Sequence, residues 1–306
     1  MILRTLHSAT NIHTVTVPYD KRMTRRTFIG AMTLAMTNIT DASAHLNEVL
    51  PLTETMPLLF IGHGNPMNAI EDNTYSRSWK EMASKLPKPK AILCVSAHWE
   101  TSGTFVTAMK SPRTIHDFGG FPQALFDAQY PAPGSPEVAG ETAKEVKKTN
   151  VGLDDKWGLD HGTWSVLLPM YPKADIPVLQ LSLDHTKPPE YHYELAKELS
   201  KLRERGVLII GSGNIVHNLR MMKWNGGSYD WAEEFDAVAK KYIAAGDHKP
   251  LIEYEKLGSA AKLSIPTNEH YLPMLYILAL AGKSTPTFFN ETLDLGSVSM
   301  RSFVVK

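Results

Sequence analysis

The segment 57–68, Pro-Leu-Leu-Phe-Ile-Gly-His-Gly-Asn-Pro-Met-Asn, constrains the fold more than any other stretch of the chain. Its apolar run, Leu58 to Ile61, predicts a buried strand. The Gly-His-Gly-Asn-Pro that follows is typical of a turn that ends a strand, so His63 is expected at the carboxyl end of that strand. Open α/β sheets bind their ligands at this edge. A histidine that only caps the strand fits equally well, and this segment alone favours the simpler interpretation.

The rest of the chain alternates short apolar runs with segments of helical spacing. This alternation predicts a single α/β domain with a central, mostly parallel sheet flanked by helices. The tail, residues 288–305, predicts a closing C-terminal hairpin. Further strands are expected at 90–98, 104–109, 178–183 and 207–214, and helices at 73–86, 136–149, 190–205, 229–245 and in an apolar segment that ends at Ala281.

Residues 1–50 have no amphipathic period and are expected to form a leader outside the catalytic domain, which we assign to residues 51–306. A basic start, a weakly apolar run and Ala42-Ser43-Ala44 follow one another in the order of a secretory signal. Thr24-Arg25-Arg26-Thr27-Phe28 resembles a twin-arginine translocation signal. This pattern favours export to the periplasm, with a disordered leader on a cytoplasmic protein as the alternative. No run of the sequence reaches the ~20 apolar residues that a membrane helix requires.

The charge balance narrows the class of partner. Lys plus Arg and Asp plus Glu both number 32, so the net charge is zero. A general nucleic-acid binder needs a basic excess, so a small neutral or anionic ligand fits this composition better. The single cysteine, Cys94, lies in an apolar run; it excludes an intrachain disulfide and a cysteine-cluster metal site, and it is expected to be buried and unreactive.

Histidines carry the strongest functional signal. Three predicted strands are each followed by a histidine, namely His63, His98 and His217. Because the carboxyl ends of parallel strands share one edge of a sheet, these imidazoles are expected to converge. Neutral imidazole is a natural ligand for iron and zinc. Glu269 or His270, at the start of a predicted helix, could supply a further ligand.

Two more histidines lie in predicted loops: His161 in an Asp-His-Gly turn, and His116 beside Asp117. The loop 111–135 that carries His116 is long and rich in proline and glycine. Loops of this length inside a compact domain are usually functional or disordered, and the aromatic residues here argue against disorder. The remaining histidines are expected to have no functional role: His185, His192 and His248 in solvent-facing contexts, and His7, His13 and His45 in the leader.

Taken together, seven motifs make the chain resemble the class III extradiol ring-cleavage dioxygenases, in the 4,5-DOPA dioxygenase-like branch of bacteria and plants. They occur in the family's order across residues 56–306, which makes the signal far more specific than any one motif. The motifs are Gly-His-Gly-Asn-Pro-Met (62–67), Ser-Ala-His-Trp (96–99), His-Asp-Phe-Gly-Gly-Phe-Pro (116–122), Tyr-Pro-Ala-Pro-Gly-Ser-Pro (130–136), Asp-His-Gly-Thr-Trp (160–164), Gly-Asn-Ile-Val-His-Asn (213–218) and Glu-His-Tyr-Leu-Pro (269–273).

The resemblance implies a non-haem Fe(II) that binds both hydroxyls of a catechol such as DOPA, with O2 inserted next to those hydroxyls. By similarity, His63 and His98 are metal ligands. The wider family uses a carboxylate near the position of Glu269 as a ligand and a histidine near His217 as base. The resemblance to the DOPA-like branch instead implies that His217 and His270 are ligands. We expect the metal to be surrounded by His63, His98, His217 and His270, with His217 doubling as the base.

The resemblance also assigns roles beyond the metal. His161 resembles the family's proton donor near the oxygen, although Asp-His-Gly is also simply a tight turn. His116 completes the expected catalytic set with His161 and His217. The loop 111–135 is expected to form one wall of the catechol pocket, where Phe118 and Phe121 would pack on the ring.

Two other classes of function use the same residues. A zinc hydrolase would need an open metal position, a metal-bound water and a nearby carboxylate, for which Glu269 or Asp117 could serve. Zinc could also occupy an iron site in a purified sample. A non-catalytic binding protein is the third class, because a fold does not fix a function. The presence of all the motif histidines argues against it. The sequence does not predict the oligomeric state.

Overall fold

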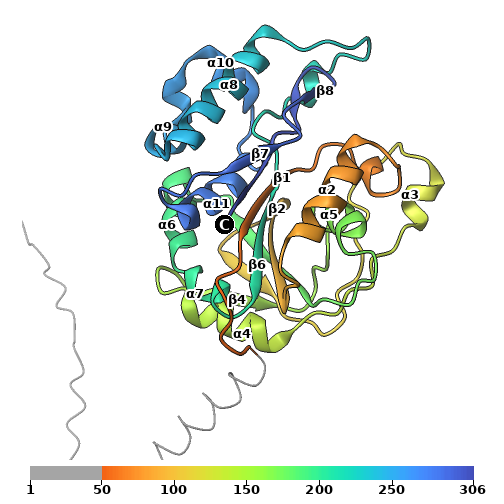
Figure 1. Ribbon diagram of the computed structural model, residues 1–306, viewed down its shortest axis with the longest axis vertical. Coiled ribbons are helices and arrows are strands. Elements are labelled where there is room, and N and C mark those ends of the chain that lie inside the picture. The colour runs from red at the N-terminus through yellow and green to blue at the C-terminus, as the bar shows by residue number, and fades with distance from the viewer. Residues whose placement is uncertain (1–49) are drawn as a thin grey trace, which may run out of the picture. The chain divides into compact units, whose positions relative to one another are not determined.

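The computed structural model describes residues 50–306, so the expected leader and its twin-arginine segment lie outside the described residues. A mixed sheet forms the centre of the domain (Figure 1). Its strands, in chain order, are β1 (Leu58–Gly62), β2 (Ala91–Thr101), β3 (Thr104–Thr107), β4 (Val151–Asp154), β5 (Val178–Asp184), β6 (Val207–Gly213), β7 (Thr287–Phe289) and β10 (Ser302–Val305). A separate two-stranded sheet pairs β8 (Leu293–Asp294) with β9 (Val298–Ser299).

The central part of the large sheet is parallel. Across the sheet the strands are ordered β4-β3-β5-β2-β6-β1-β10-β7. The four middle strands, β5, β2, β6 and β1, run parallel to one another, while β10 pairs antiparallel with both β1 and β7. Every residue of β1, β5 and β6 is buried, as expected for strands covered on both faces. The predicted mostly parallel sheet and C-terminal hairpin are therefore confirmed.

Helices cover both faces of the sheet (Figure 1). Helices α2 and α5 pack on one face, and α11 and α6 pack on the other. The helices are α2 (Thr74–Lys85), α3 (Gln123–Asp127), α4 (Pro136–Glu145), α5 (His161–Met170), α6 (Pro189–Lys197), α7 (Ser200–Arg203), α8 (Asp230–Ala245), α9 (Lys249–Ile252), α10 (Ser259–Ser264) and α11 (Leu272–Ala281), with 3-10 turns η1 (Pro66–Ala69), η2 (Leu219–Met221) and η3 (Tyr254–Leu257).

Helix α2 shows how local sequence fixes an element. Asn73 and Ser76 form a capping box, in which each side chain bonds the backbone of the other, and this arrangement satisfies amide groups that the first turn leaves unpaired. Ser76, Trp79 and Ala83 then lie on one buried face, because residues three and four apart share a side of a helix. Trp79 is fully buried in the core cluster that also contains Trp164 of α5.

Several boundaries differ from the sequence expectations. The predicted helix 190–205 is split into α6 and α7, and the predicted helix 136–149 ends at Glu145. Strand β2 continues past His98 to Thr101, with a register shift between Val95 and Glu100 in its pairing to β5. His98 therefore projects from an irregular part of a strand rather than from the turn after it.

Two histidines that were expected to face solvent are buried. The Nδ1 atom of His192, on α6, lies 3.0 Å from the Tyr276 hydroxyl of α11. His248 Nδ1 lies 2.9 Å from the Tyr193 hydroxyl. Burial lowers the pKa of His192 to about 4. The expectation was wrong because a polar sequence context does not reveal which face of a helix meets its neighbour. Cys94 is buried as predicted, and burial raises the pKa of its thiol.

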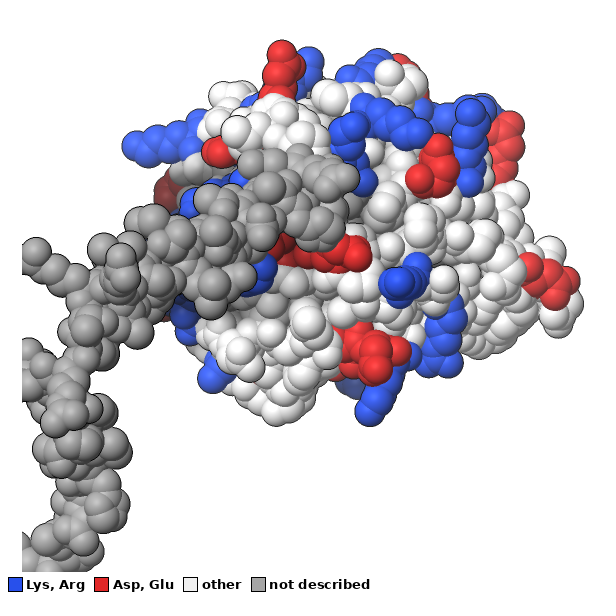
Figure 2. Space-filling view, turned by 90° about the horizontal axis from the view of Figure 1, so that it is seen from below, with Lys and Arg blue, Asp and Glu red and all other residues white. Residues whose placement is uncertain are grey.

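The surface carries charges of both signs. On the face shown in Figure 2, the basic and acidic side chains of the described residues are interspersed. No helix within residues 50–306 is both long and apolar enough to cross a membrane.

A buried ion pair ties the C-terminal strands to α8. The Arg301 Nε lies 3.1 Å and 3.0 Å from the two carboxylate oxygens of Asp236, and Ser299 Oγ donates to the same carboxylate at 2.6 Å. Glu291 also contacts the Arg301 guanidinium. The side chains of Arg301 and Asp236 are only 7% and 9% exposed, so little water could replace either partner.

We predict that Asp236→Asn lowers the free energy of unfolding by about 3 kcal/mol, because it leaves a buried guanidinium partly uncompensated. Urea denaturation followed by circular dichroism measures the change. The control is Glu81→Gln, which removes an exposed ion pair with Lys85 on α2 and should leave stability essentially unchanged. Equal losses in the two variants would contradict the structural role given to Asp236.

Candidate metal centre

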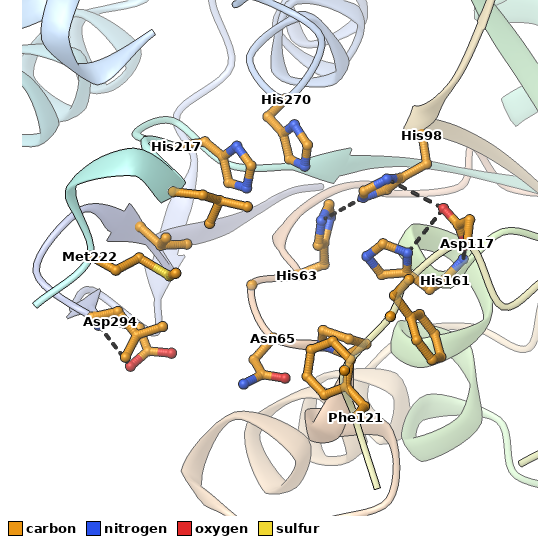
Figure 3. A pocket seen from close by; sticks show the side chains of 18 of the residues that line it. His63, Asn65, His98, Asp117, Phe121, His161, His217, Met222, His270 and Asp294 are labelled. Atoms are coloured by element: carbon orange, nitrogen blue, oxygen red, sulfur yellow. Dashed lines mark hydrogen bonds and ion pairs between the residues drawn. The ribbon is translucent and has the colours of Figure 1, made fainter. Parts of the chain in front are cut away.

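Five histidines converge at the carboxyl edge of the parallel strands (Figure 3). They come from separate elements: His63 directly after β1, His98 within β2, His161 at the start of α5, His217 after β6, and His270 just before α11. All five line one pocket of about 580 Å³. This volume lies within the range of roughly 300–1,000 Å³ that is usual for small-molecule sites.

The strand register places the first two histidines. Strand β6 lies between β1 and β2, with Gly62 opposite Gly213 and Ser96 opposite Ser212. The amide of His63 donates to the Gly213 carbonyl at 3.1 Å, which extends the pairing of β1 and β6 by one bond. The two strands therefore deliver their histidines to the same level of the sheet edge.

His270 reaches this edge because its backbone packs directly on β6. The amide of Asn214 donates to the His270 carbonyl at 2.8 Å. A Cβ atom at Gly213 would lie 2.1 Å from that same carbonyl oxygen, so no larger residue fits there without moving one of the two segments. Glycine at 213 is required by this close approach.

Three of the five imidazoles are spaced as ligands of one ion. Ring centroids are 5.1 Å apart for His63 and His98, 5.3 Å for His63 and His270, and 4.9 Å for His98 and His270. With metal–nitrogen distances of about 2.0–2.1 Å, imidazoles that share an ion have centroids roughly 5 Å apart. These three side chains could therefore hold a single metal between them.

The other two histidines flank this trio. His217 stacks on His270, with ring centroids 3.5 Å apart and an interplanar angle of 8°. His161 leans on His98, with centroids 3.8 Å apart. His217, Glu269 and His270 each offer one ligand atom, and these atoms lie within 4.8 Å of one another, as do those of His63, His98 and His161. The expected four-histidine set is thus brought together in one pocket.

Hydrogen bonds to the outer ring nitrogens fix which nitrogen faces the pocket. Ser212 Oγ donates its only proton to the Gly162 carbonyl, so it accepts from His63 Nδ1 at 3.1 Å. The Glu269 carboxylate accepts from His270 Nδ1 at 2.9 Å. Both rings consequently present an unprotonated Nε2 to the pocket, an arrangement typical of metal-binding histidines. Glu269 thus contacts the far side of the His270 ring.

The facing nitrogens favour a cation between them. His63 Nε2 and His98 Nε2 are 3.2 Å apart, while the other nitrogen of His98 lies 3.4 Å from the Asp117 carboxylate. When both outer nitrogens carry protons, the two Nε2 lone pairs face each other and repel. A metal ion between them removes this repulsion, and the chemistry of the donor set therefore fits a metal site.

Burial keeps these imidazoles neutral. It is the largest cause that lowers the pKa values of His63, His98 and His270 well below the ordinary histidine value, and neighbouring histidines lower them further. Burial also lowers the pKa of His217 to about 4, with His161 contributing. A neutral imidazole has a free lone pair, so the cluster is ready to bind metal at pH 7.

Two aspartates hold the His161 side of the pocket. Asp117 Oδ2 lies 3.0 Å from His161 Nδ1, and its Oδ1 accepts from the His161 amide at 2.9 Å. Burial raises the pKa of Asp117, but the interactions with His161 and His98 outweigh burial, and the pKa is lowered overall. Asp160 caps α5 through the Thr163 amide and accepts from Ser96 Oγ at 2.7 Å. Burial raises the pKa of Asp160.

The loop 111–135 supplies an aromatic wall, as expected. Phe118 and Phe121 line the pocket, with ring centroids 5.4 Å apart. His116 does not line it: its Nε2 donates to the Ala128 carbonyl at 2.9 Å, and its ring packs near Trp164. We therefore leave His116 out of the proposed catalytic set.

The opposite wall contains residues that the sequence motifs did not indicate. They come from η2 and the loop after it, and from the hairpin formed by β8, β9 and the turn between them. Only the helix-capping position of Asp160, directly before an apolar helix, offered a sequence signal for a supporting residue that was missed. The unexpected wall residues are Leu219, Met222, Trp224, Asp294, Leu295 and Val298.

We predict that Gly213→Ala displaces the His270 segment, lowers the free energy of unfolding by about 1–3 kcal/mol and weakens metal binding. Thermal denaturation and a metal titration measure the two effects. The control is Gly140→Ala in α4, where an added Cβ meets no atom within 4 Å and the helix should be stabilised by up to about 1 kcal/mol. Unchanged metal affinity in Gly213→Ala would show that His270 is not positioned through β6.

Comparison with known proteins identifies the family. A family model described as the catalytic LigB subunit of aromatic ring-opening dioxygenase matches residues 57–302. The 4,5-DOPA dioxygenase extradiol of Escherichia coli K12 is 48% identical over 264 residues, which cover 84% of this chain and 97% of that protein. The protein of the same name from Beta vulgaris is 39% identical over 254 residues, covering 80% of this chain and 94% of that protein.

A solved structure agrees with the family match. The crystal structure of an uncharacterized protein from Escherichia coli K12 has a TM-score of 0.72 and 44% sequence identity to this chain, covering 82% of it and 100% of the crystallised chain. The fold, the histidine cluster and these similarities agree with one another. The chain belongs to the LigB family and is an extradiol, ring-opening dioxygenase.

Proposed function

We propose that this enzyme opens the ring of a catechol such as DOPA with O2, next to rather than between the two hydroxyls, with one non-haem Fe(II) held by His63, His98 and His270. The observation that carries the proposal is the near-equal spacing of these three rings, 4.9–5.3 Å between centroids, at the base of an aromatic-walled pocket. Imidazole suits iron and zinc alike, so zinc could occupy the same ligands. An Fe(II) held by these three residues would supply Lewis-acid chemistry that makes the catechol hydroxyls more acidic and would bring the catechol and O2 together.

His217 is the proposed base. It stacks on His270 with ring centroids 3.5 Å apart and is not one of the three evenly spaced rings, so we place it beside the metal rather than on it. Its lowered pKa, about 4, leaves the ring neutral at pH 7 and able to accept a proton from a catechol hydroxyl. The negative charge that develops on the catechol oxygen would stabilise the protonated ring.

His161 is the proposed proton donor on the oxygen side. Asp117 orients it from behind, with a carboxylate oxygen 3.0 Å from His161 Nδ1. A carboxylate in that position holds the ring in one orientation and leaves the other nitrogen directed at the pocket, as in other Asp–His pairs. Figure 3 shows His161 between Asp117 and the centre of the histidine cluster.

The aromatic wall would hold the substrate ring. Phe118 and Phe121 meet edge to face, and Phe118 also meets His161 edge to face at 5.5 Å between centroids. Apolar faces at this position exclude water from the reacting atoms and favour an aromatic ligand.

The arrangement of carboxylates argues against a zinc hydrolase. Such an enzyme needs a carboxylate free to take a proton from metal-bound water. Glu269 contacts the outer nitrogen of His270, and Asp117 contacts the outer nitrogens of His161 and His98. Both carboxylates are thus engaged behind the imidazoles. The direct test is anaerobic Fe(II) loading followed by a catechol and air: the expected result is a yellow product with matching O2 uptake, and ester or amide hydrolysis without O2 uptake would replace this proposal.

We predict that His63→Ala, His98→Ala and His270→Ala lose bound iron, whereas His217→Ala keeps its iron and loses turnover. The reason is that these first three rings have near-equal centroid spacings, as ligands of one ion would. Metal analysis after anaerobic loading, together with circular dichroism to verify the fold, measures this. If His217→Ala lost iron and His270→Ala retained it, the roles of these stacked rings would be reversed.

We predict that His161→Ala retains iron and binds catechol anaerobically but turns over at least ~100-fold more slowly, because a proton donor acts mainly in the transition state. Phe121→Ala should instead raise KM more than it lowers kcat. Anaerobic affinity and O2 uptake separate the two effects. His116→Ala is the matched control, since this histidine lies outside the pocket and its loss should leave kcat within a few-fold of wild type. Loss of iron in His161→Ala would make this residue a ligand.

A further inference from the structure

The end of the pocket away from His161 has a chemistry that ring opening does not explain. Asp294 lies there, and Figure 3 shows it on the side of the pocket remote from Asp117. Apart from Asp117, it is the only acidic side chain among the described residues that line the pocket, and none of those residues is Lys or Arg. The chain's zero net charge suggested a neutral or anionic ligand, but the local charge at this end is negative.

We propose that the Asp294 carboxylate binds a positively charged amine on the side chain of the catechol, so that the enzyme selects catechol amines over catechol acids. This inference rests on the proposed function and specifies its substrate class. The catechol hydroxyls would lie at the histidines, the ring between the aromatic wall and the apolar side chains opposite, and the amine at Asp294.

The carboxylate has room for such a partner. Its Oδ1 accepts from the Leu295 amide at 3.0 Å. None of the ion pairs found within residues 50–306 includes Asp294. Burial raises the pKa of this group, which is the direction expected of a partly desolvated acid that lacks a cation. A ligand ammonium would supply the missing charge.

A strained turn presents Asp294 to the pocket. The Ser297 amide donates to the Asp294 carbonyl at 3.2 Å, and the two residues between them, Leu295 and Gly296, have φ values of 48° and 70°. Positive φ is unusual for a bulky residue such as leucine, and strain of this kind gathers at functional sites. Both Asp294 and Leu295 line the pocket, so the strained turn forms part of the pocket wall.

The neighbouring loop adds an aromatic face. The amides of Asn218 and Lys223 donate to the carbonyls of Ser297 and Leu295 at 3.0 and 2.8 Å, which ties the segment 218–223 along the turn. Trp224 follows directly and lines the same pocket. Its side chain is 76% exposed and is not part of the hydrophobic core. An indole face attracts a nearby cation, so Trp224 and Asp294 favour the same kind of ligand group.

The same wall disfavours an acidic side chain. A catechol acid would place its carboxylate near Asp294 with no described Lys or Arg in the pocket to balance it. A like charge at a binding site acts against the wrong ligand and so adds to the selectivity that an opposite charge gives for the right one. A catechol amino acid carries both charges and should bind more weakly than the corresponding simple amine.

The test uses three catechols of similar length: 4-(2-aminoethyl)catechol, neutral 4-propylcatechol and the anion 3,4-dihydroxyphenylacetate. Dissociation constants are measured without turnover, by calorimetry on the zinc-loaded protein, and kcat/KM is measured on the iron-loaded enzyme. We expect the amine to bind at least about 10-fold tighter than 4-propylcatechol, and the anion to bind more weakly than both. The preference for the amine should shrink as salt is added.

Asp294→Asn is the informative variant, because asparagine can still accept from the Leu295 amide and keep the turn. It should bring the ratio of the amine and propyl dissociation constants close to 1. Asp155→Asn, which removes an exposed acid outside the pocket, should leave that ratio unchanged. If Asp294→Asn does not fold, two other measurements test the same ratio. Trp224→Leu should reduce it, and added salt should reduce it in the wild-type protein.

Two results would overturn the inference: equal affinity of the wild-type protein for the amine and for 4-propylcatechol, or an unchanged ratio in Asp294→Asn. Failure of the proposed function has a different signature. In that case 4-propylcatechol would give no O2 uptake with the iron-loaded enzyme. The ratio of the amine and propyl dissociation constants would still test the role of Asp294, because it is measured without turnover.

Discussion

The parallel register of β6 between β1 and β2 is the constraint on which the rest of the site depends. It sets Gly62 against Gly213 and Ser96 against Ser212, so His63 after β1 and His98 within β2 lie at one level of the sheet edge. Ser212 then reaches the His63 ring, and the Gly213 position admits the backbone of His270. A slip of one residue in this pairing would turn every side chain of β6 to the opposite face and separate these contacts. The same strand register is therefore required both for the packing of the sheet and for the geometry of the site.

Electrostatics of the site follow from the same packing. Burial removes water from the imidazoles and keeps them neutral, while acids such as Glu269 and Asp117 stand behind the rings instead of between them. The two carboxylates therefore contact the Nδ1 atoms of the rings and not the nitrogens that face the pocket. They orient the rings and fix their protons without occupying positions that substrate oxygens would need. The imidazoles are buried, and hydrogen-bond acceptors such as Ser212 Oγ and Glu269 lie at their outer nitrogens.

Sequence was informative where the signal is local. Apolar runs predicted the parallel strands, and the turns after them predicted that His63, His98 and His217 would meet, because strand ends share an edge. It did not distinguish His116 from its neighbour Asp117, since adjacent loop residues point in different directions and only the fold decides which faces the pocket. The wall around Asp294 was missed for another reason: backbone hydrogen bonds between two distant segments create it, and such bonds leave no residue pattern.

The stacking of His217 on His270 shows a further limit. Both residues lie in motifs, and both were expected at the metal, but no motif spacing encodes the direct stacking of the two rings at 3.5 Å between centroids. The wide separation of the histidines along the chain has a consequence for biogenesis. His270 lies 207 positions after His63 and just before α11, the last of the described helices, so the five-histidine cluster cannot form before a nascent chain extends past His270. The complete cluster is therefore available to an ion only after β1, β2 and β6 have paired and the segment before α11 has packed on β6.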